Sequence, residues 1–356
     1  MTATNPVTQP LFHDSFNALP DALRPFPFAG HRAMLVGDTH TLALFGQAVR
    51  ERLESVFCKV SVYEFEAGEE HKTLNSVKGL LAAMIDGHFD RKDCIVALGG
   101  GVVGDMGGFA AAIYLRGIPV VQIPTTLLAQ VDSSIGGKTG VDFDGYKNMI
   151  GAFHMPACIY TNVSVLSALP DDQFASGMGE VIKSALLGDA ALYRWLQTNR
   201  DGIAARDPAL LLEMIRRTAE IKVEIVTEDP TEQGRRALLN LGHTVGHAVE
   251  KACRFTMMHG ACVAVGLAAA ASMSISRGLI REEDRTDIIR TLHDYGLPSS
   301  VSGLRAEDVL RITKSDKKMS DGQIRFILLR SPGSAFYTDD VTDGELLAGI
   351  RSVLTD

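Results

Sequence analysis

The sequence predicts an α/β domain with a mainly parallel sheet at residues 1–168, followed by a mainly α-helical domain at residues 169–356. In the first half, short β-branched runs alternate with helical patterns, which indicates parallel strands joined by crossover helices. Near Ser167–Asp172 the pattern changes, because Pro170 and two aspartates form a helix-start signal. Helical patterns fill most of the remaining chain, so we expect two domains with a cleft between them.

The strands of the first domain are expected at short β-branched or apolar runs. Cys94–Leu98 is wholly apolar and leads into three glycines at 99–101, as expected for a strand that ends in a turn. Helical patterns cover Leu42–Leu53 and Thr73 to about His88. The expected strands are Ala33–Gly37, Val60–Phe65, Cys94–Leu98 and Pro119–Ile123.

The second domain should be built mostly from helices. One late β-rich segment, Gln323–Leu329, is expected to belong to a small hairpin. The expected helices cover residues 173–199, 208–228, 236–253, 260–277 and 284–295.

Composition narrows the class of protein. The 356 residues, 46% apolar and 22% charged, suffice for two domains of an ordinary globular enzyme, and the net charge of -8 argues against nucleic acid as a partner. The five cysteines are scattered and form no CxxC pair, so a reducing cytosol is expected. Met1–Pro10 lacks the features of a signal peptide, and the apolar stretch Ala261–Ile275 is too short to span a bilayer. We therefore expect a cytoplasmic protein with no nucleic-acid and no membrane partner.

A glycine-rich turn suggests nucleotide binding. Gly99–Asp105 follows a strand, opens a helix and contains G-x-G-x-x-G, and glycines there allow a diphosphate to approach free N–H groups. The motif alone is weak, and a tight strand–helix turn explains this segment equally well, since no acidic residue follows about twenty positions on. A second turn, Val36–Asp38, offers the Asp38 carboxylate to a ribose hydroxyl. Two such turns favour a dinucleotide.

A histidine cluster suggests a metal site. His243 and His247 lie four residues apart on a helical pattern, and His259 precedes the next helix. A lone histidine is more often a hydrogen-bonded core residue, but three together favour zinc or a related ion, with Glu180 available to complete the set. The HExxH motif of metalloproteases is absent from the sequence.

Several lysines and arginines lie near these segments. Each could be a solvated surface charge, which is the usual fate of lysine. Lys138 and Lys147, however, lie in glycine-rich stretches beside apolar runs, and Lys183 shares a helical face with Glu180. Converging cations beside a metal suggest a pocket for carboxylate and phosphate. The set is Lys138, Lys147, Lys183, Lys222, Arg236 and the pair Lys317–Lys318.

Seven segments occur in an order and spacing typical of one family. They are Gly100–Asp105, Tyr114–Gly117, Pro124–Ser134, Gly136–Gly140, Lys147–Gly151, Gly179–Lys183 and Leu239–His247. Together they resemble the 3-dehydroquinate synthases of the sugar phosphate cyclase superfamily, from about residue 30 to about residue 330.

The resemblance implies a role for each matching residue. It implies zinc or cobalt ligation by Glu180, His243 and His259, which leaves His247 as an active-site histidine and corrects the first grouping of the histidines. Arg116 is expected to reach the site of a neighbouring subunit, which implies a homodimer. The NAD+ contacts implied are Asp38, Glu69, Lys72, Gly101, Val102, Asp105, Thr125, Thr126, Lys138 and Lys147. The substrate or catalytic contacts implied are Asp132, Lys138, Asn148, Lys183, Lys222, Arg236, Asn240, His247 and one lysine of the pair, Lys317 or Lys318.

The resemblance also implies a lyase reaction. Its substrate is a phosphorylated sugar acid, 3-deoxy-D-arabino-heptulosonate 7-phosphate, and its products are 3-dehydroquinate and phosphate, in the shikimate pathway of aromatic amino acid biosynthesis. The implied steps are transient oxidation by NAD+, phosphate elimination, re-reduction and an intramolecular aldol reaction. Two departures from the family pattern occur. Val165 and Ala168 replace threonines near the cofactor, and Val141–Asp144 replaces a loop to which no chemistry is assigned.

Three alternatives stay open on the sequence. Another sugar phosphate cyclase would share almost every motif, and a metal-dependent polyol dehydrogenase would share the fold but not the phosphate-binding lysines. A non-catalytic relative would not need the complete ligand set. Asn240, three positions before His243 on the expected helix, and the Lys317–Lys318 pair favour a substrate that carries a carboxylate.

Overall fold

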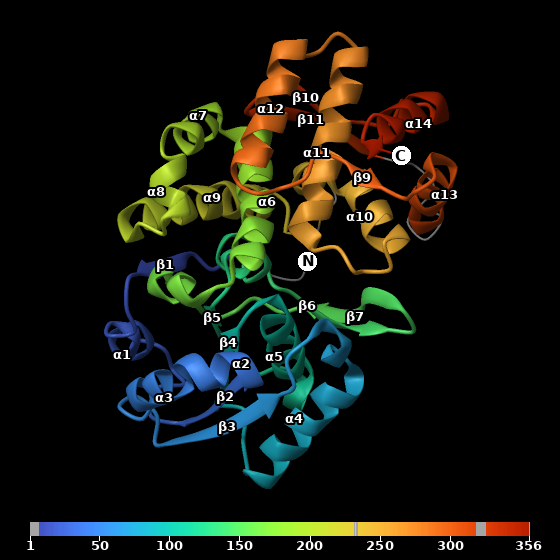
Figure 1. Cartoon of the computed structure of the whole chain (residues 1–356). Coiled ribbons are helices and arrows are strands. Elements are labelled where there is room, and N and C mark those ends of the chain that lie inside the picture. Colours follow the sequence, from blue (N-terminus) through green and yellow to red (C-terminus); the bar gives the residue numbers. More distant parts are fainter. Residues whose placement is uncertain (1–6, 231, 233, 318–324, 356) are drawn as a thin grey trace. The chain divides into compact units, whose positions relative to one another are not determined.

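The structure, a computed structural model, describes residues 7–230, 232, 234–317 and 325–355 (Figure 1). The chain forms two compact units, Met1–Leu169 and Pro170–Asp356, and the expected boundary lies one residue earlier. The first unit is an α/β layered structure and the second is mainly helical, so the expected fold class is confirmed.

The first unit contains a six-stranded sheet in which every neighbouring pair is parallel, in the order β1-β8-β5-β4-β2-β3. The strands are β1 (Pro10–His13), β2 (Arg32–Asp38), β3 (Lys59–Phe65), β4 (Cys94–Gly99), β5 (Val120–Pro124) and β8 (Cys158–Asn162). The helices are α1 (Leu19–Leu23), α2 (Thr39–Thr41), α3 (Gln47–Leu53), α4 (Leu74–Asp86) and α5 (Gly101–Ile113), with a π-helical segment Leu42–Gly46 before α3.

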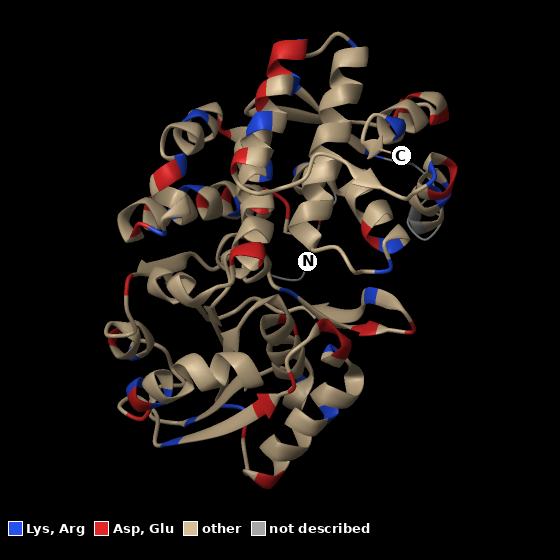
Figure 2. Ribbon diagram, viewed as in Figure 1, with Lys and Arg blue, Asp and Glu red and all other residues tan. Residues whose placement is uncertain are grey.

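Both faces of this sheet are covered. In β4, Ile95 and Ala97 pack toward α4 and α5, whereas Val96 and Leu98 pack toward α1 and α3. Burial on both faces explains why β4 is a continuous apolar run and why neither β4 nor β5 carries a charged residue, as their tan ribbons show (Figure 2). The one amide side chain of β5, Gln122, is buried and donates to the Gly104 carbonyl oxygen at 3.0 Å. Figure 1 shows the corresponding arrangement, with helices on either side of the strands.

The order of the strands reverses between β2 and β4. From β2 the chain moves to β3 at one edge, and it then returns to place β4 on the other side of β2. In open parallel sheets, ligands bind beyond the carboxyl ends of the strands at such a switch point. Here those ends are Asp38 of β2 and Gly99 of β4.

A two-stranded hairpin, β6 (Lys138–Phe143) and β7 (Tyr146–Phe153), lies outside the main sheet and packs on α5. This hairpin is not among the strands expected from the sequence, in which the stretch is identified by its glycines, lysines and family segments. A methyl group on Gly108 of α5 would overlap the side chain of Thr139 in β6, so a residue without a side chain is needed where the hairpin approaches the helix.

The second unit is organised around α11, which contacts α6, α10, α12 and α14. Its helices are α6 (Asp171–Gly188), α7 (Ala190–Thr198), α8 (Arg200–Ala204), α9 (Pro208–Glu228), α10 (His243–Ala252), α11 (His259–Ser276), α12 (Glu282–Asp294), α13 (Ala306–Lys317) and α14 (Asp343–Arg351). Its strands are β9 (Val301–Ser302), β10 (Phe326–Ser331), β11 (Ser334–Thr338) and β12 (Leu354–Thr355), paired as β10–β11 and β9–β12.

Helix α11 is the one described helix that is long and apolar enough to cross a membrane by composition alone. It carries no Lys, Arg, Asp or Glu, and it is drawn entirely in tan (Figure 2). Because 72% of it is buried within the protein, it has the surroundings of a core helix. The helix is longer than the apolar stretch Ala261–Ile275, so its burial, rather than a short length, distinguishes it from a membrane span.

Two of the expected helices are interrupted. The segment 173–199 divides at Asp189, whose side chain accepts a hydrogen bond from the Leu192 N–H and so caps α7. The segment 236–253 divides at Gly242, which has a left-handed φ of 78° and separates a 3₁₀ segment, Arg235–Asn240, from α10. A Cβ at Gly242 would lie 3.0 Å from the Val263 carbonyl oxygen, so close packing against α11 explains this glycine. The expected late hairpin is present as β10–β11, although Gln323 lies outside the described residues.

Candidate functional site

Three side chains of the second unit form a compact set of metal-binding groups. Glu180 comes from α6, while His243 and His259 are the first residues of α10 and α11. Nε2 of His243 and Nε2 of His259 lie 3.6 Å and 3.5 Å from the same oxygen of Glu180, Oε1. The three ligand atoms lie within 4.8 Å of one another, and Glu180 is 1% exposed.

These distances fit a tetrahedral ion. Two ligand atoms that are each about 2.0–2.1 Å from zinc at the tetrahedral angle are separated by about 3.3–3.4 Å. The two Glu180–histidine distances of 3.5 and 3.6 Å are therefore close to those that zinc or cobalt requires. A carboxylate and two imidazoles also leave a coordination position open for substrate oxygen.

Close helix packing brings the three ligands together. A Cβ on Gly179, next to Glu180, would lie 2.6 Å from the carbonyl oxygen of Gly260, next to His259. Residues with side chains at these two positions would hold α6 and α11 farther apart. The glycine beside each ligand therefore serves the packing of the site.

The remaining imidazole nitrogens face hydrogen-bond acceptors. Nδ1 of His243 lies 3.2 Å from the Leu241 carbonyl oxygen, and Nδ1 of His259 lies 3.6 Å from Oε2 of Glu250. The ring of His247, which is exposed, lies 5.0 Å from that of His243. Glu250 is not among the residues expected from the sequence, although its position three residues after His247 on one helical face is a usable signal.

The protonation states of the ligands differ. Burial alone would raise the pKa of Glu180, but Lys183 and the two imidazoles hold this pKa well below its usual range. Burial lowers the pKa of His243 to about 3. Burial also acts to lower the pKa of His259, but Glu180 and Glu250 on either side of the ring raise it to about 10.

Three cations of the expected substrate set are buried in this unit. Lys183, Lys222 and Arg236 are 1%, 7% and 2% exposed. Lys183 contacts Oε2 of Glu180. The backbone N–H of Arg236 donates to Asp229 at 3.0 Å, and its guanidinium donates to the Pro230 carbonyl oxygen at 2.7 Å. Such buried cations match a ligand with several negative charges.

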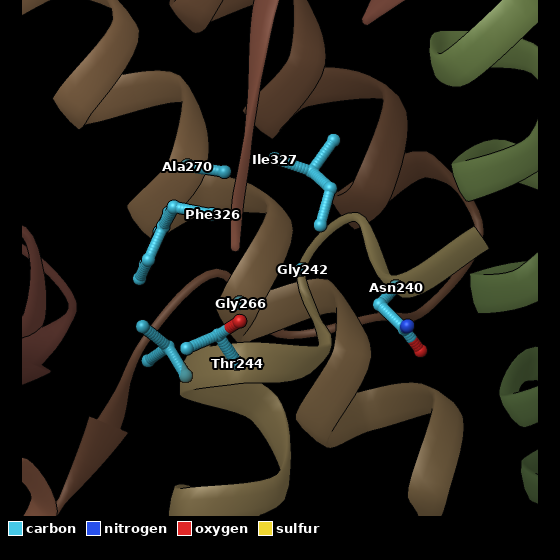
Figure 3. Close-up of a pocket in the computed structure, with 8 residues that line it drawn as sticks. Asn240, Gly242, Thr244, Gly266, Ala270, Phe326 and Ile327 are labelled. Atoms are coloured by element: carbon cyan, nitrogen blue, oxygen red, sulfur yellow. The ribbon is translucent and has the colours of Figure 1, made fainter. Parts of the chain in front are cut away.

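The expectation that Asn240 shares a helix with His243 is wrong. Asn240 ends the separate 3₁₀ segment, and its amide donates to Oε1 of Glu232 at 3.1 Å. Asn240 lines a small pocket with mostly apolar residues, and in Figure 3 its amide points away from Phe326 and Ile327. The helical argument for a carboxylate contact at Asn240 therefore fails, because Gly242 breaks the helix.

In the first unit, the glycine turn lies at the switch point of the sheet. Gly100 is the N-cap of α5 in an extended conformation, and among the described residues no side chain caps this helix. Gly101 and Val102 form its first turn. The Asp38 carboxylate caps α2, accepting from the Thr41 N–H at 2.7 Å.

Four of the other residues expected to contact NAD+ lie close together, with Asn148 from the expected substrate set. The ammonium group of Lys72, a residue that is 4% exposed, donates to Asp105 and to the Asn148 side chain, each at 2.6 Å. Nearby, Lys147 lies 3.5 Å from Glu69. The structure thus brings these five residues, from α5, β7 and the turn before α4, into one region.

Asp142 contacts the same group of residues and is not among those expected from the sequence. Its carboxylate accepts from the backbone N–H of Asn148 at 2.8 Å, and its own N–H donates to the Lys72 carbonyl oxygen at 2.9 Å. Burial raises the pKa of Asp142.

The other expected residues are distributed over both units. Thr125 is buried and Thr126 accepts from the Ala129 N–H at 3.1 Å, both just after β5. Lys138 is exposed at the start of β6, whereas Asp132 is half-buried. Arg116 is exposed and has a φ of 69°. Lys317 is the last residue of α13, and Lys318 lies outside the described residues.

Two family models match consecutive parts of the chain. The model described as 3-dehydroquinate synthase N-terminal matches residues 62–176, and the one described as 3-dehydroquinate synthase C-terminal matches residues 177–319. Together the two matches cover more than half of the sequence.

Curated relatives cover nearly the whole chain. A 3-dehydroquinate synthase of Symbiobacterium thermophilum is 42% identical over 325 residues, which is 90% of both chains. A 3-dehydroquinate synthase of Caulobacter vibrioides is 43% identical over 324 residues, 89% of this chain and 88% of the relative.

Solved structures share the fold over the full length. The 2-epi-5-epi-valiolone synthase of Streptomyces hygroscopicus subsp. jinggangensis, with NAD+ and Zn2+ bound, has a TM-score of 0.91 at 25% identity and covers 99% of this chain and 98% of its own. A 2-deoxy-scyllo-inosose synthase complexed with carbaglucose-6-phosphate, NAD+ and Co2+ has a TM-score of 0.84 at 24% identity, covering 99% and 100%.

Proposed function

Because the chain belongs to the 3-dehydroquinate synthase family, we propose that it converts 3-deoxy-D-arabino-heptulosonate 7-phosphate to 3-dehydroquinate and phosphate, with NAD+ and Zn2+ or Co2+ as cofactors. The observation that carries the proposal is the set Glu180, His243 and His259, whose separations of 3.5 and 3.6 Å suit a tetrahedral ion. The reaction belongs to the shikimate pathway, and the enzyme is a lyase.

NAD+ fits the switch point of the first unit. The first turn of α5, with Gly101 and Val102, carries no side-chain cap and offers N–H groups to a diphosphate. Asp38 ends the neighbouring strand, where its carboxylate can accept from a ribose hydroxyl. Thr125 and Thr126 follow β5, the strand next to β4. Lys72 joins Asp105 of α5 to Asn148 of the β6–β7 hairpin. These residues would hold the cofactor and orient it.

When bound, NAD+ supplies a reversible hydride acceptor, and the metal ion polarises a substrate oxygen. The chain's own side chains bind the anionic groups and move protons. We assign Lys183, Lys222 and Arg236, all buried, to the phosphate and carboxylate of the substrate. The exposed imidazole of His247 is the group that exchanges protons with substrate, since its ring nitrogens lie beside the ligand cluster.

The residual contacts follow from the family resemblance. Asp132, Asn148 and Asn240 bind substrate hydroxyl groups, and one lysine of the Lys317–Lys318 pair binds the substrate carboxylate. Glu69, Lys138 and Lys147 line the cofactor or the phosphate. These roles are proposals for each position of this chain.

The test uses purified enzyme, the heptulosonate phosphate and a catalytic amount of NAD+. Phosphate should form in large molar excess over NAD+ without accumulation of NADH, because the hydride returns within each turnover. His259→Ala should lose both bound zinc and activity, whereas His293→Ala, at an exposed histidine of α12 that bonds only locally to Ser299, should keep both. Product that never exceeds the NAD+ supplied would mean a net dehydrogenase and would refute the proposal. Comparable kcat/KM with sedoheptulose 7-phosphate would indicate a different cyclase.

We also propose a cytoplasmic homodimer. Arg116 and Leu115, which follow α5, are exposed and have positive φ values of 69° and 49°. A partner subunit at this segment would cover Leu115 and receive Arg116 in its site. All five cysteines are free thiols, as a reducing compartment allows. Light scattering after size-exclusion chromatography tests the dimer, and a monomeric mass would contradict it.

A further inference from the structure

Glu250 is a buried carboxylate next to the ligand cluster. It lies on α10 and is 5% exposed. Its Oε2 atom is 3.6 Å from Nδ1 of His259, and the ligand atoms of His247, Glu250 and His259 all lie within 4.8 Å of one another. A buried carboxylate needs hydrogen-bond donors or a positive partner, and the groups facing this one include two imidazoles.

We propose that Glu250 is a positioning residue for the metal site, which holds His259 with its proton on Nδ1 and its Nε2 directed at the ion. The proposal rests on the metal centre of the proposed function. Its geometric basis is that the His259 ring lies between two carboxylates, with Nε2 at 3.5 Å from Glu180 and Nδ1 at 3.6 Å from Glu250.

The tautomer of His259 decides whether it can bind a metal. A neutral imidazole carries one proton, and the nitrogen without that proton is the one that can ligate. An acceptor at Nδ1 keeps the proton there and leaves the lone pair on Nε2, which faces Glu180. Carboxylates commonly take this place behind metal-binding histidines, where they also raise the basicity of the ring.

The second histidine ligand provides an internal comparison. Behind His243 stands the neutral Leu241 carbonyl oxygen, 3.2 Å from Nδ1. It fixes the tautomer of that ring but carries no formal charge. We therefore expect removal of the Glu250 charge to affect His259 selectively and to leave His243 unchanged.

The experiment measures zinc binding to the full chain, without substrate, by competition with a chromophoric chelator. Glu250→Gln should weaken zinc binding about 10- to 100-fold, the usual effect of losing such a partner. Glu250→Asp keeps the charge and should recover part of the affinity. Glu307→Gln, at an exposed carboxylate of α13 that pairs with Arg351, is the matched control and should bind zinc like the parent protein.

Two spectroscopic readouts separate positioning from direct ligation. In the cobalt-loaded protein, Glu250→Gln should preserve the visible spectrum, because all three ligands remain. Nitrogen-15 NMR of labelled histidine in the zinc form should show the Nδ1–H tautomer of His259 in the parent protein.

If Glu250→Gln binds zinc within twofold of the parent protein, the proposal is overturned. Loss of the cobalt spectrum in Glu250→Gln would also overturn it, because Glu250 would then be a metal ligand. An Nε2–H tautomer at His259 in the parent protein would overturn it as well. These outcomes differ from failure of the proposed function, in which the parent protein itself would neither bind zinc nor release phosphate.

Discussion

Replacing Gly179 by alanine should separate two of the three metal ligands. The new Cβ would lie 2.6 Å from the carbonyl oxygen of Gly260 and 2.9 Å from its Cα atom. Non-bonded carbon atoms prefer about 3.5–4.0 Å, so α6 and α11 would have to move apart by about 0.6–1 Å. Glu180 follows Gly179 directly and His259 precedes Gly260, so this movement acts on the metal site itself.

The expected effect is large for metal binding and moderate for stability. Oε1 of Glu180 and Nε2 of His259 are 3.5 Å apart. A helix movement of about 0.6–1 Å would separate them too far for one ion to bind both atoms, because metal–ligand distances vary by only about 0.2 Å. We expect at least a tenfold loss of zinc affinity. Overpacking of this kind also costs about 1–3 kcal/mol of unfolding free energy.

Zinc affinity is measured by chelator competition, and stability by urea unfolding followed through Trp195. This residue is the only tryptophan of the sequence and lies in α7, so its fluorescence reports on the second unit. Gly188→Ala is the matched control on the same helix, because its Cβ would meet only Ile221 at an ordinary 3.7 Å. Parental zinc affinity in Gly179→Ala would refute the argument that glycine packing sets the ligand spacing.

Three further predictions concern the metal, its protons and the hairpin network. Protein in a zinc concentration about 1,000 times the dissociation constant should have a free energy of unfolding about 4 kcal/mol higher than the same protein in excess chelator. In His259→Ala the two conditions should give the same free energy of unfolding, measured by tryptophan fluorescence. Zinc binding at pH 7 should release about one proton, which comes from His259, because the pKa of His259 is raised to about 10 while that of His243 is lowered to about 3. Zinc affinity should therefore rise with pH up to about pH 10. Calorimetry in two buffers of different ionisation enthalpy checks this, and absence of proton release would contradict it. Lys72→Met should lower the free energy of unfolding by about 3 kcal/mol, because it leaves the partly buried Asp105 carboxylate without the Lys72 ammonium group. Lys78→Met, at an exposed lysine of α4, is the control and should leave the free energy of unfolding almost unchanged. Both are measured by urea unfolding followed by circular dichroism.

Local patterns in the sequence were sufficient for the centre of the first unit. The run Cys94–Leu98 is apolar because β4 is buried on both faces, and the glycines after it mark the turn into α5. Local patterns also pointed to the three histidines, with Glu180 as a possible fourth group, and the family resemblance then implied Glu180, His243 and His259 as the ligands. The structure brings these three side chains within ligand distance of one another.

The features that sequence analysis missed depend on contacts between distant segments. Strand β8 has only five residues, and its place in the sheet depends on pairing with β5 and β1 rather than on its own periodicity. The break at Gly242 arises from α11, which lies more than twenty positions away at its contact with Leu267. Asp142 gains its role only because β6 and β7 pair and bring it next to Asn148.

The pairing of β1 with β8 has a consequence for how the chain folds during synthesis. Strand β1 joins the sheet in parallel register with β8, Pro10 opposite Ile159, and the Tyr160 hydroxyl donates to the Ser15 carbonyl oxygen, 145 positions earlier. Closing a loop of that length costs about 4 kcal/mol in chain entropy. While the ribosome is still producing the segment before Cys158, β5 has an open edge and β1 has no strand to join. Nascent chains of this length therefore present an unpaired strand edge, the feature through which partly made sheets associate with one another. Once Cys158–Asn162 is available, this short strand covers the edge of β5 and pairs with β1, so that the four-residue strand β1 becomes the edge of the sheet in place of β5.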